Sequence, residues 1–397
     1  MLRSVQFFIA FLFLFLTGNN IHAQSAKVPG VVVNHIPAST GVYIGSPSIC
    51  ILPDGDYVAS HDHFGPNSTE HERAVTAVYK STNKGKSWKK ISEINGQFWS
   101  NLFVHQNALY IMGTWKHHGN FIIRRSDDGG MTWTSPNDNK SGLLLEGEYH
   151  TAPMPVTAHD GRLWRAIENA KSYTTRWGIR YSAMVISAPV ETDLLNAENW
   201  TATNPLPHDS AYLDGKFGGW LEGNAVVTPE GKIVDILRVA TSDPGQDLAA
   251  IVNISADGKT AKFDPDTGFW DFVGGARKFS IRYDEKSKRY WTLANMVKDE
   301  FKHIRAASVR NTLVLKSSDN LKDWTVHKIL LEHPDVEKHG FQYVDWQFDG
   351  RHIIFLSRTA YDDESGGAKN FHDANFLTFH RIKKFRKLQK EAVLQEF

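Results

Sequence analysis

The chain has 397 residues, with 45 Lys and Arg against 44 Asp and Glu, which gives a formal net charge of +1. Because this charge is close to zero, it provides no overall field for nucleic acid, and any attraction to an acidic ligand must be local. The single cysteine, Cys50, leaves no internal disulfide, so the fold must be stabilised by its core.

Residues 1–24 have the pattern of a secretory signal peptide. The basic start MLR is followed by an apolar run from Phe7 to Leu16 and then by small and polar residues. This run is too short to span a membrane. We therefore predict an exported protein, periplasmic or secreted, in which residues 25–397 form one catalytic domain without membrane association.

Short alternating apolar runs, separated by turns such as PDG, HDG, PEG and FDG, predict that the rest of the chain is all-β. Strand–turn–strand units recur along it and indicate a large repetitive domain. The segment 31–40 can supply a strand that closes the ring onto the last unit and removes an exposed edge. We count six clear units, which begin at Pro47, Trp99, Tyr149, Trp220, Arg277 and Gln342.

A second repeat, Ser-x-Asp-x-Gly-x-Thr-Trp, marks some of the turns. It is complete in SDDGGMTW (126–133) and degenerate in STNKGKSW (81–88) and SSDNLKDW (317–324). The pattern resembles the Asp boxes of sialidase-like β-propellers, in which the Asp accepts backbone N–H groups and the Trp packs between blades. The sequence therefore predicts a single β-propeller whose Asp boxes are structural and lie away from the active face.

In a propeller, the innermost strand of each blade starts at the mouth of the central pocket and the next strand returns to it. This rule places many Arg, His, Tyr and Trp residues at the mouth. Guanidinium groups bind carboxylates or sulfates, and aromatic faces stack on sugar rings, so the predicted ligand is an anionic polysaccharide or oligosaccharide. The residues predicted to bind it are His61, Trp115, His150, Trp220, Glu222, Arg277 and Arg358.

The cationic residues of this set suit β-elimination at a uronic acid. The proton at C5 of the sugar can leave only when the carboxylate charge is offset and the developing enolate is stabilised. Arg165 and Arg238 are placed to do this, and a Tyr or His within reach would abstract the proton. Ordinary glycoside hydrolysis by two carboxyl groups stays open, with Asp62, Glu222 and Asp345 available.

Four segments, 34–65, 147–155, 220–238 and 371–388, resemble the propeller group of ulvan lyases, rhamnose–glucuronate lyases and related rhamnosyl-glucuronate hydrolases. The resemblance spans nearly the whole mature chain. It implies seven blades and a target bond between α-L-rhamnose and O4 of D-glucuronate. It also implies a catalytic Tyr, assisting His residues and a neutralising Arg, which map onto Tyr149, His63, His118, Arg165 and Arg238.

These observations predict a polysaccharide lyase that leaves a 4,5-unsaturated uronate, with ulvan as the favoured substrate. A hydrolase of the same bond, acting on arabinogalactan or gum arabic, is an alternative; it would use a histidine on the opposite face, such as His35 or His105. An inactive glycan-binding propeller is another. A sialidase is disfavoured, because Gly45 stands where its first carboxylate-binding Arg is expected.

We expect a monomer that requires no cofactor and no catalytic metal. The sequence His61–Asp62–His63 could hold a structural Ca²⁺ or Zn²⁺ ion. A His-x-His pair alone is a weak metal signal.

Overall fold

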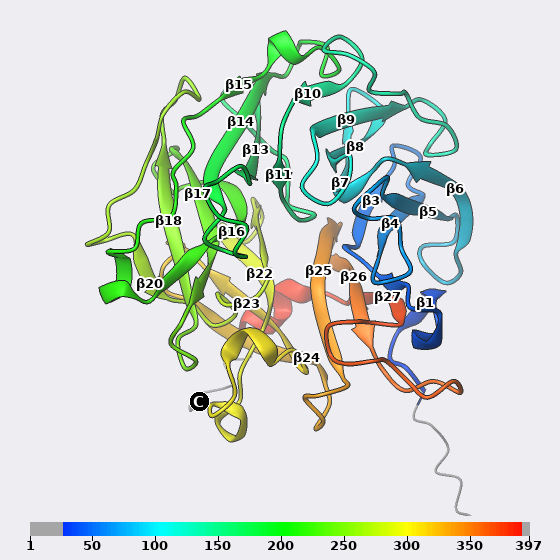
Figure 1. Ribbon diagram of the computed structural model, residues 1–397. Coiled ribbons are helices and arrows are strands. Elements are labelled where there is room, and N and C mark those ends of the chain that lie inside the picture. Colours follow the sequence, from blue (N-terminus) through cyan, green and yellow to red (C-terminus); the bar gives the residue numbers. More distant parts are fainter. Residues whose placement is uncertain (1–26, 391–397) are drawn as a thin grey trace, which may run out of the picture.

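The structure is a computed structural model that describes residues 27–390, so the predicted signal peptide lies outside the described residues. Six sheets of four or five strands stand around a central axis (Figure 1). This confirms the all-β propeller with six blades. The seven blades implied by the family resemblance are wrong for residues 27–390, because the long stretch between Asn169 and Phe217 supplies outer strands of blade 3. No helix in the described chain is long and apolar enough to cross a membrane.

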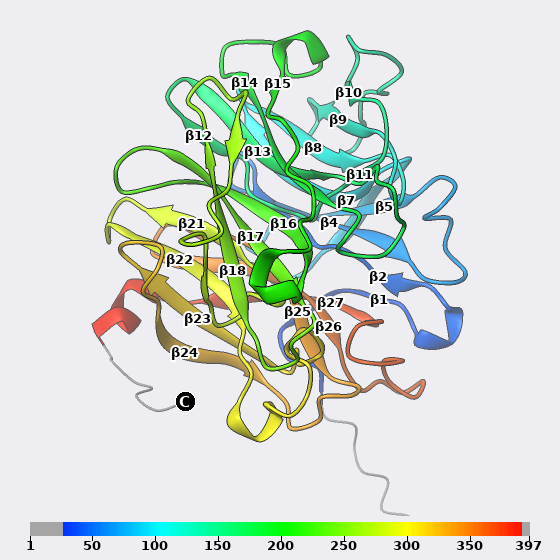
Figure 2. The same ribbon diagram turned by 60° about the vertical axis from the view of Figure 1, so that its left-hand side comes forward.

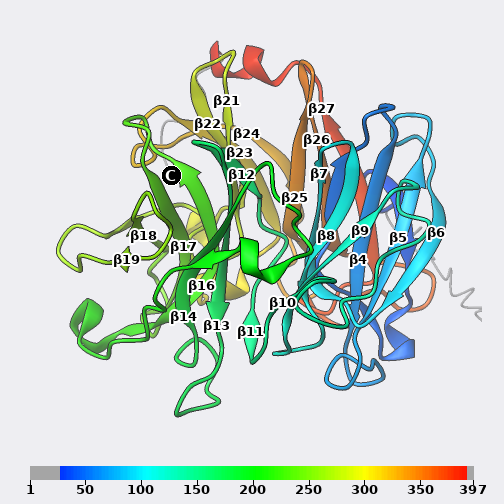
Figure 3. The same cartoon turned by 90° about the horizontal axis from the view of Figure 1, so that it is seen from above.

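The chain builds the blades in order, and Figures 2 and 3 show consecutive blades standing side by side. Blade 1 comprises β2 (Tyr43–Ile44), β3 (Ser48–Ile51), β4 (Tyr57–Phe64), β5 (Val75–Ser81) and β6 (Lys89–Asn95). Blade 2 comprises β7 (Phe98–His105), β8 (Ala108–Thr114), β9 (Phe121–Ser126) and β10 (Leu143–Leu145). Blade 3 comprises β11 (Tyr149–His150), β12 (Thr157–His159), β13 (Arg162–Asn169), β14 (Ser182–Pro189) and β15 (Thr201–Ala202).

Blade 4 comprises β16 (Phe217–Val227), β17 (Ile233–Thr241), β18 (Leu248–Ile254), β19 (Ala261–Lys262) and β20 (Phe269–Asp271). Blade 5 comprises β21 (Ser280–Asp284), β22 (Arg289–Asn295), β23 (Thr312–Ser318) and β24 (Thr325–Glu332). Blade 6 comprises β25 (Gly340–Asp349), β26 (His352–Ala360), β27 (Phe376–Ile382) and β1 (Val31–His35). Short 3-10 helices span Ala38–Thr40, Ala197–Asn199, Tyr212–Gly215, Asp299–Phe301, Ala306–Ser308 and Phe385–Lys390.

The two ends of the described chain close the ring. Strand β1 pairs antiparallel with β27 and becomes the outermost strand of blade 6, so the blue and red ends meet in Figure 1. Val33 of β1 then packs in one core cluster with Ile44 of blade 1 and Leu377 of blade 6. The predicted closure by segment 31–40 is confirmed.

The complete Asp box forms the turn after β9, at the end of blade 2 away from the mouth. Asp128 Oδ1 accepts the backbone N–H groups of Met131 and Thr132 at 3.0 and 2.9 Å. Although burial acts to raise the pKa of Asp128, the hydrogen bonds it accepts lower it to about 2. Trp133 packs on the core shared by blades 1 and 2. The structural role predicted for this box is confirmed.

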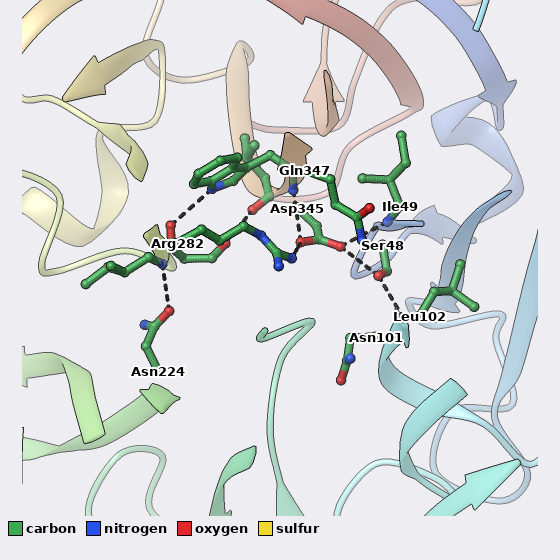
Figure 4. A network of polar contacts seen from close by, with 12 residues as sticks. Ser48, Ile49, Asn101, Leu102, Asn224, Arg282, Asp345 and Gln347 are labelled. Carbon is green, nitrogen blue, oxygen red and sulfur yellow. Dashed lines mark hydrogen bonds and ion pairs between the residues drawn. The ribbon is translucent and has the colours of Figure 1, made fainter. Parts of the chain in front are cut away.

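Polar side chains near the axis tie neighbouring blades together (Figure 4). Asp345 of β25 accepts the N–H of Ile49 at 2.9 Å and the hydroxyl of Ser48 at 2.7 Å, both on β3. The Ser48 oxygen in turn accepts the N–H of Leu102 on β7 at 2.9 Å. Blades 6, 1 and 2 are therefore joined by one set of hydrogen bonds, which fixes inner strands that carry the mouth.

Candidate active site

Three inner strands carry the same irregularity near their mouth ends. Strands β7, β16 and β25 each contain a bulge, at Trp99, Glu222 and Tyr343, with φ angles of 50°, 53° and 52°. A non-glycine residue in this region costs about 1–3 kcal/mol and persists only where its surroundings fix it. Two positions later, Asn224 and Asp345 each accept an N–H group from the next blade, which holds two of the bulges in place. Bulges re-aim side chains, and these three direct one group from each of three blades to the mouth.

A cavity of about 330 Å³ opens beside these residues. It adjoins a second cavity of about 220 Å³, which shares Trp177 and His372 with it and is also lined by Arg238 and Arg310. Pockets of this size, with aromatic walls and a few polar groups, are typical of small-molecule sites. The residues that line the first cavity include Glu70, Trp99, His117, Trp177, Tyr343 and Arg358.

Glu222 and Arg238 form a buried ion pair at the mouth, with 3.0 Å between Oε2 and Nη1. Burial alone would raise the pKa of Glu222. The charges of Arg238 and His150, the hydrogen bond from Arg238 and the nearby Tyr343 hydroxyl instead lower this pKa below its usual value. Glu222 is therefore ionised at neutral pH and can accept the proton of the Tyr343 hydroxyl group.

Two further guanidinium groups flank the Tyr343 ring. The Arg310 and Arg358 groups lie 5.5 and 4.9 Å from its centroid. Arg310 Nε donates to the carbonyl of Ala307 and Arg358 Nε to that of His372, so the backbone orients both. Within residues 27–390, Arg310 Nη2 and Arg358 Nη1 take part in no hydrogen bond. Together with Arg238, these donors provide a site for a carboxylate.

Glu70 contributes a second carboxyl group to the wall of this cavity. Burial raises its pKa to about 7, so much of it is protonated at neutral pH and can donate a proton. Burial also raises the pKa of Asp62 to about 7. The Asp62 carboxyl, however, accepts the Thr76 hydroxyl at 2.8 Å and the N–H of Trp99 at 2.7 Å, inside the contact between blades 1 and 2. Glu70 is therefore the better placed proton donor.

A row of His and Tyr rings extends the mouth towards blade 3. His118 Nε2 lies 2.9 Å from the Tyr181 hydroxyl, and His150 Nδ1 lies 2.7 Å from Glu168 Oε2. The His150 and Tyr181 rings stack at 4.2 Å. Burial lowers the pKa of His118 to about 2 and that of His117 to about 3, so both are uncharged at neutral pH. These rings suit hydrogen bonding and stacking with a sugar.

The structure brings several of the predicted site residues together. Glu222 and Arg238 are paired, and the Tyr343 ring connects them to Arg358. His118 and His150 lie beside them, within contact of Trp99. These five predicted residues share one mouth.

Tyr149 and Arg165 occupy positions that differ from their predicted catalytic roles. The Tyr149 ring is only 8% exposed and packs edge-on against Phe121 in the core between blades 2 and 3. Burial raises its pKa, whereas a catalytic base requires a lowered one. Arg165 is fully buried near the axis, where it donates to Asn101, to Thr151 and to two backbone carbonyls. These positions favour structural roles for both residues.

Three residues predicted to bind substrate also lie away from the two mouth cavities. Trp220 is fully buried in the core of blade 4. Arg277 is 1% exposed and donates to Asp247 at 2.8 Å. Trp115 packs in blade 2, with the Arg124 guanidinium 5.9 Å from its ring. Their positions do not support the predicted role in binding.

The sequence His61–Asp62–His63 does not converge on one point. Successive side chains of a strand point to opposite faces. His61 Nε2 contacts the Asn34 amide at 2.9 Å and its ring lies 5.2 Å from that of His63, while Asp62 faces blade 2. These three side chains therefore offer no common site for the structural ion that the sequence could hold here, and both His residues lie away from the mouth cavities.

Four residues of the site were not predicted from the sequence: Tyr343, Arg310, Glu70 and Trp177. The sequence does contain a pattern that could have found Tyr343. An Asn or Asp follows two residues after each of Trp99, Glu222 and Tyr343, in the first half of an inner strand. That spacing marks the three bulges. Arg310, Glu70 and Trp177 lie in connections outside the strands, where the repeat provides no register.

The sequence matches no protein-family model and no curated protein. Solved structures are similar over most of the chain. A Penicillium chrysogenum α-L-arabinanase complexed with arabinobiose is 15% identical, with 93% of this chain and 100% of that chain covered and a TM-score of 0.53. A Hadza microbial sialidase is 15% identical, with 92% and 69% covered and a TM-score of 0.60. A Dyadobacter fermentans protein of unknown function is 14% identical, with 90% and 99% covered and a TM-score of 0.58. These likenesses show a shared β-propeller fold, and they do not show membership of the ulvan lyase group.

Proposed function

We propose that this chain is a carbohydrate-active enzyme that cleaves a glycosidic bond beside a sugar carboxylate, with Tyr343 as the attacking group. The observation that carries this proposal is the Tyr343 side chain, whose ring is flanked by the guanidinium groups of Arg310 and Arg358 and which lies near the ion pair of ionised Glu222 with Arg238. Propellers of the same fold include an arabinanase and a sialidase, which supports a saccharide ligand. The predicted signal peptide supports action outside the cytoplasm.

Hydrolysis of an acidic sugar glycoside is the reaction that this arrangement supports best. When the anomeric carbon itself carries a carboxylate, an anionic nucleophile is repelled, whereas a neutral phenol is not; sialidases use a Tyr nucleophile. Glu222 would take the proton of Tyr343 as its oxygen bonds to the anomeric carbon, and Glu70 would protonate the departing oxygen. Water would then displace the Tyr343 oxygen from the anomeric carbon, with Glu70 accepting the water proton and Glu222 returning its proton to Tyr343.

In the sequence, the absence of an Arg at position 45 disfavours a sialidase. In the structure, this absence counts less against one. A Cβ at Gly45 would lie 2.6 Å from the Asp62 carbonyl oxygen, so this backbone leaves no room for a side chain. Arg358 reaches the site from blade 6 instead. It supports the proposal by providing a third guanidinium from another blade.

β-Elimination at the rhamnose–glucuronate bond, predicted from the family resemblance, is the second candidate. The cationic surroundings of Tyr343 favour it, because the enolate that forms when the C5 proton leaves needs such stabilisation. Tyr343, after giving its own proton to Glu222, would then abstract this proton in place of Tyr149, and Glu70 would protonate the leaving O4. Ulvan, with its uronate and sulfate groups, is the favoured substrate in this case.

One experiment distinguishes the two reactions. We would incubate the purified protein with sialosides, ulvan and gum arabic, and follow free acidic sugar, ultraviolet absorbance of unsaturated uronate, and free rhamnose. The proposal expects free acidic sugar without a rise in absorbance. A rise in absorbance would establish the lyase, and free rhamnose without absorbance would establish hydrolysis of the rhamnose–glucuronate bond. Binding without any product would instead indicate a glycan-binding propeller.

A further inference from the structure

A cluster of His and Asp residues lies beside the mouth end of blade 6, outside the proposed reaction site. His333, Asp335 and His339 lie in the connection between β24 and β25, and each brings one ligand atom within 4.8 Å of the others. Asp362, which follows β26, joins them, with its Oδ2 3.5 Å from His339 Nε2.

The hydrogen bonds of His339 determine which of its nitrogens bears a lone pair. Nδ1 lies 2.8 Å from Asp335 Oδ2, and since an ionised carboxylate only accepts, Nδ1 carries the hydrogen. In the neutral ring, Nε2 is then an acceptor. His339 is 4% exposed, and its Nε2 is buried without a hydrogen-bond partner in the described part of the chain. It faces the Asp362 carboxylate, so two acceptors oppose each other and require a cation between them.

We infer that His333, His339 and Asp362 bind a divalent transition metal ion, with zinc the best match, and that Asp335 orients His339 from outside the metal. Imidazole nitrogens and carboxylate oxygens at about 2.0–2.2 Å in tetrahedral geometry stand roughly 3.4 Å apart, which agrees with the 3.5 Å between His339 Nε2 and Asp362 Oδ2. The His333 ring stacks on His339 with 3.5 Å between centroids. Its Nδ1 accepts the N–H of Asp335 at 3.1 Å, which leaves Nε2 as the nitrogen of the second imidazole. A carboxylate on the remote nitrogen of a ligand His is the usual outer partner at such sites.

The position of this metal gives it a structural role near the mouth. His339 stands immediately before β25, which carries Tyr343, and Asp362 follows β26, which carries Arg358. A metal bound by both residues would therefore link the mouth ends of these two strands. The inference does not depend on which reaction the site performs.

Titration of Zn²⁺ into untagged, EDTA-treated protein tests the inference by calorimetry. We expect one binding site with a Kd in the micromolar range or below, and a higher melting temperature with Zn²⁺ present. His339→Ala should weaken binding at least 100-fold, and Asp335→Asn 10- to 100-fold. The matched control is His303→Ala, an exposed histidine in the preceding loop of blade 5, which should bind as the native chain does.

Asp362→Asn provides a second variant that leaves the core intact, since the Asp362 side chain is 48% exposed. It should weaken Zn²⁺ binding while the melting temperature of the metal-free protein stays unchanged. The inference is overturned if the native chain binds no Zn²⁺, because the cation between His339 and Asp362 is then a proton. It is also overturned if His339→Ala binds Zn²⁺ as tightly as the native chain.

Discussion

Replacing Tyr343 with Phe is expected to lower kcat by at least about 10²–10⁴-fold, the range for loss of a positioned acid–base group. The change removes only the hydroxyl, which lies near Glu222 and Arg238. Because the ring keeps its contacts with Arg310 and Arg358, the carboxylate site should persist. KM should therefore change little while kcat falls, which steady-state kinetics on the substrate identified by the product assay would show.

Tyr149→Phe is the matched control for this variant. Its hydroxyl makes no hydrogen bond within residues 27–390, and its ring lies in the core between blades 2 and 3. The variant should retain kcat within a few-fold of the native value. If Tyr149→Phe loses turnover and Tyr343→Phe keeps it, the assignment derived from the structure is wrong and the one derived from the family resemblance is right.

The second large effect concerns Glu70. Burial raises its pKa to about 7, so it holds its proton below this pH and loses it above. A general acid with this pKa predicts that kcat/KM falls as the pH rises through about 7, because kcat/KM reports the ionisation of the free enzyme. Glu70→Gln, which cannot donate a proton, should lower kcat/KM by about 10²-fold or more and remove this decline.

Glu72→Gln provides the control, since Glu72 is an exposed carboxylate in the same loop. It should leave both the rate and the pH profile unchanged. An undiminished decline above neutral pH in Glu70→Gln would assign the proton donor to another group, with Asp62 the next candidate because its pKa also lies near 7.

The sequence predicts the propeller because its signals are local and repeated. Alternating strands, turn motifs and the Asp box at 126–133 each report on a few neighbouring residues, and all of them hold in the structure. Ring closure by segment 31–40 was predictable for the same reason, since a propeller must pair its last edge. The seventh blade came from the resemblance alone, and no strand repeat supported it.

The site was harder to predict because bulges change the face on which a side chain lies. A one-residue insertion in a strand reverses inside and outside for the residues that follow. In β16, counting from the start of the unit places Trp220 and Glu222 on one face; the structure places Trp220 in the core and Glu222 in an ion pair at the mouth. A bulge in β25 likewise moves Tyr343 off the face that strict alternation of side chains predicts for it.

The most direct test of the proposed active site is the structure of Tyr343→Phe with an acidic oligosaccharide bound. We would use the sialoside or uronate substrate that the product assay identifies. We expect the sugar carboxylate to lie among Arg238, Arg310 and Arg358, with the scissile bond between position 343 and Glu70. A sugar bound instead in the cavity on the opposite face, which Arg282 and Tyr283 line, would overturn the assignment of the active site to the mouth.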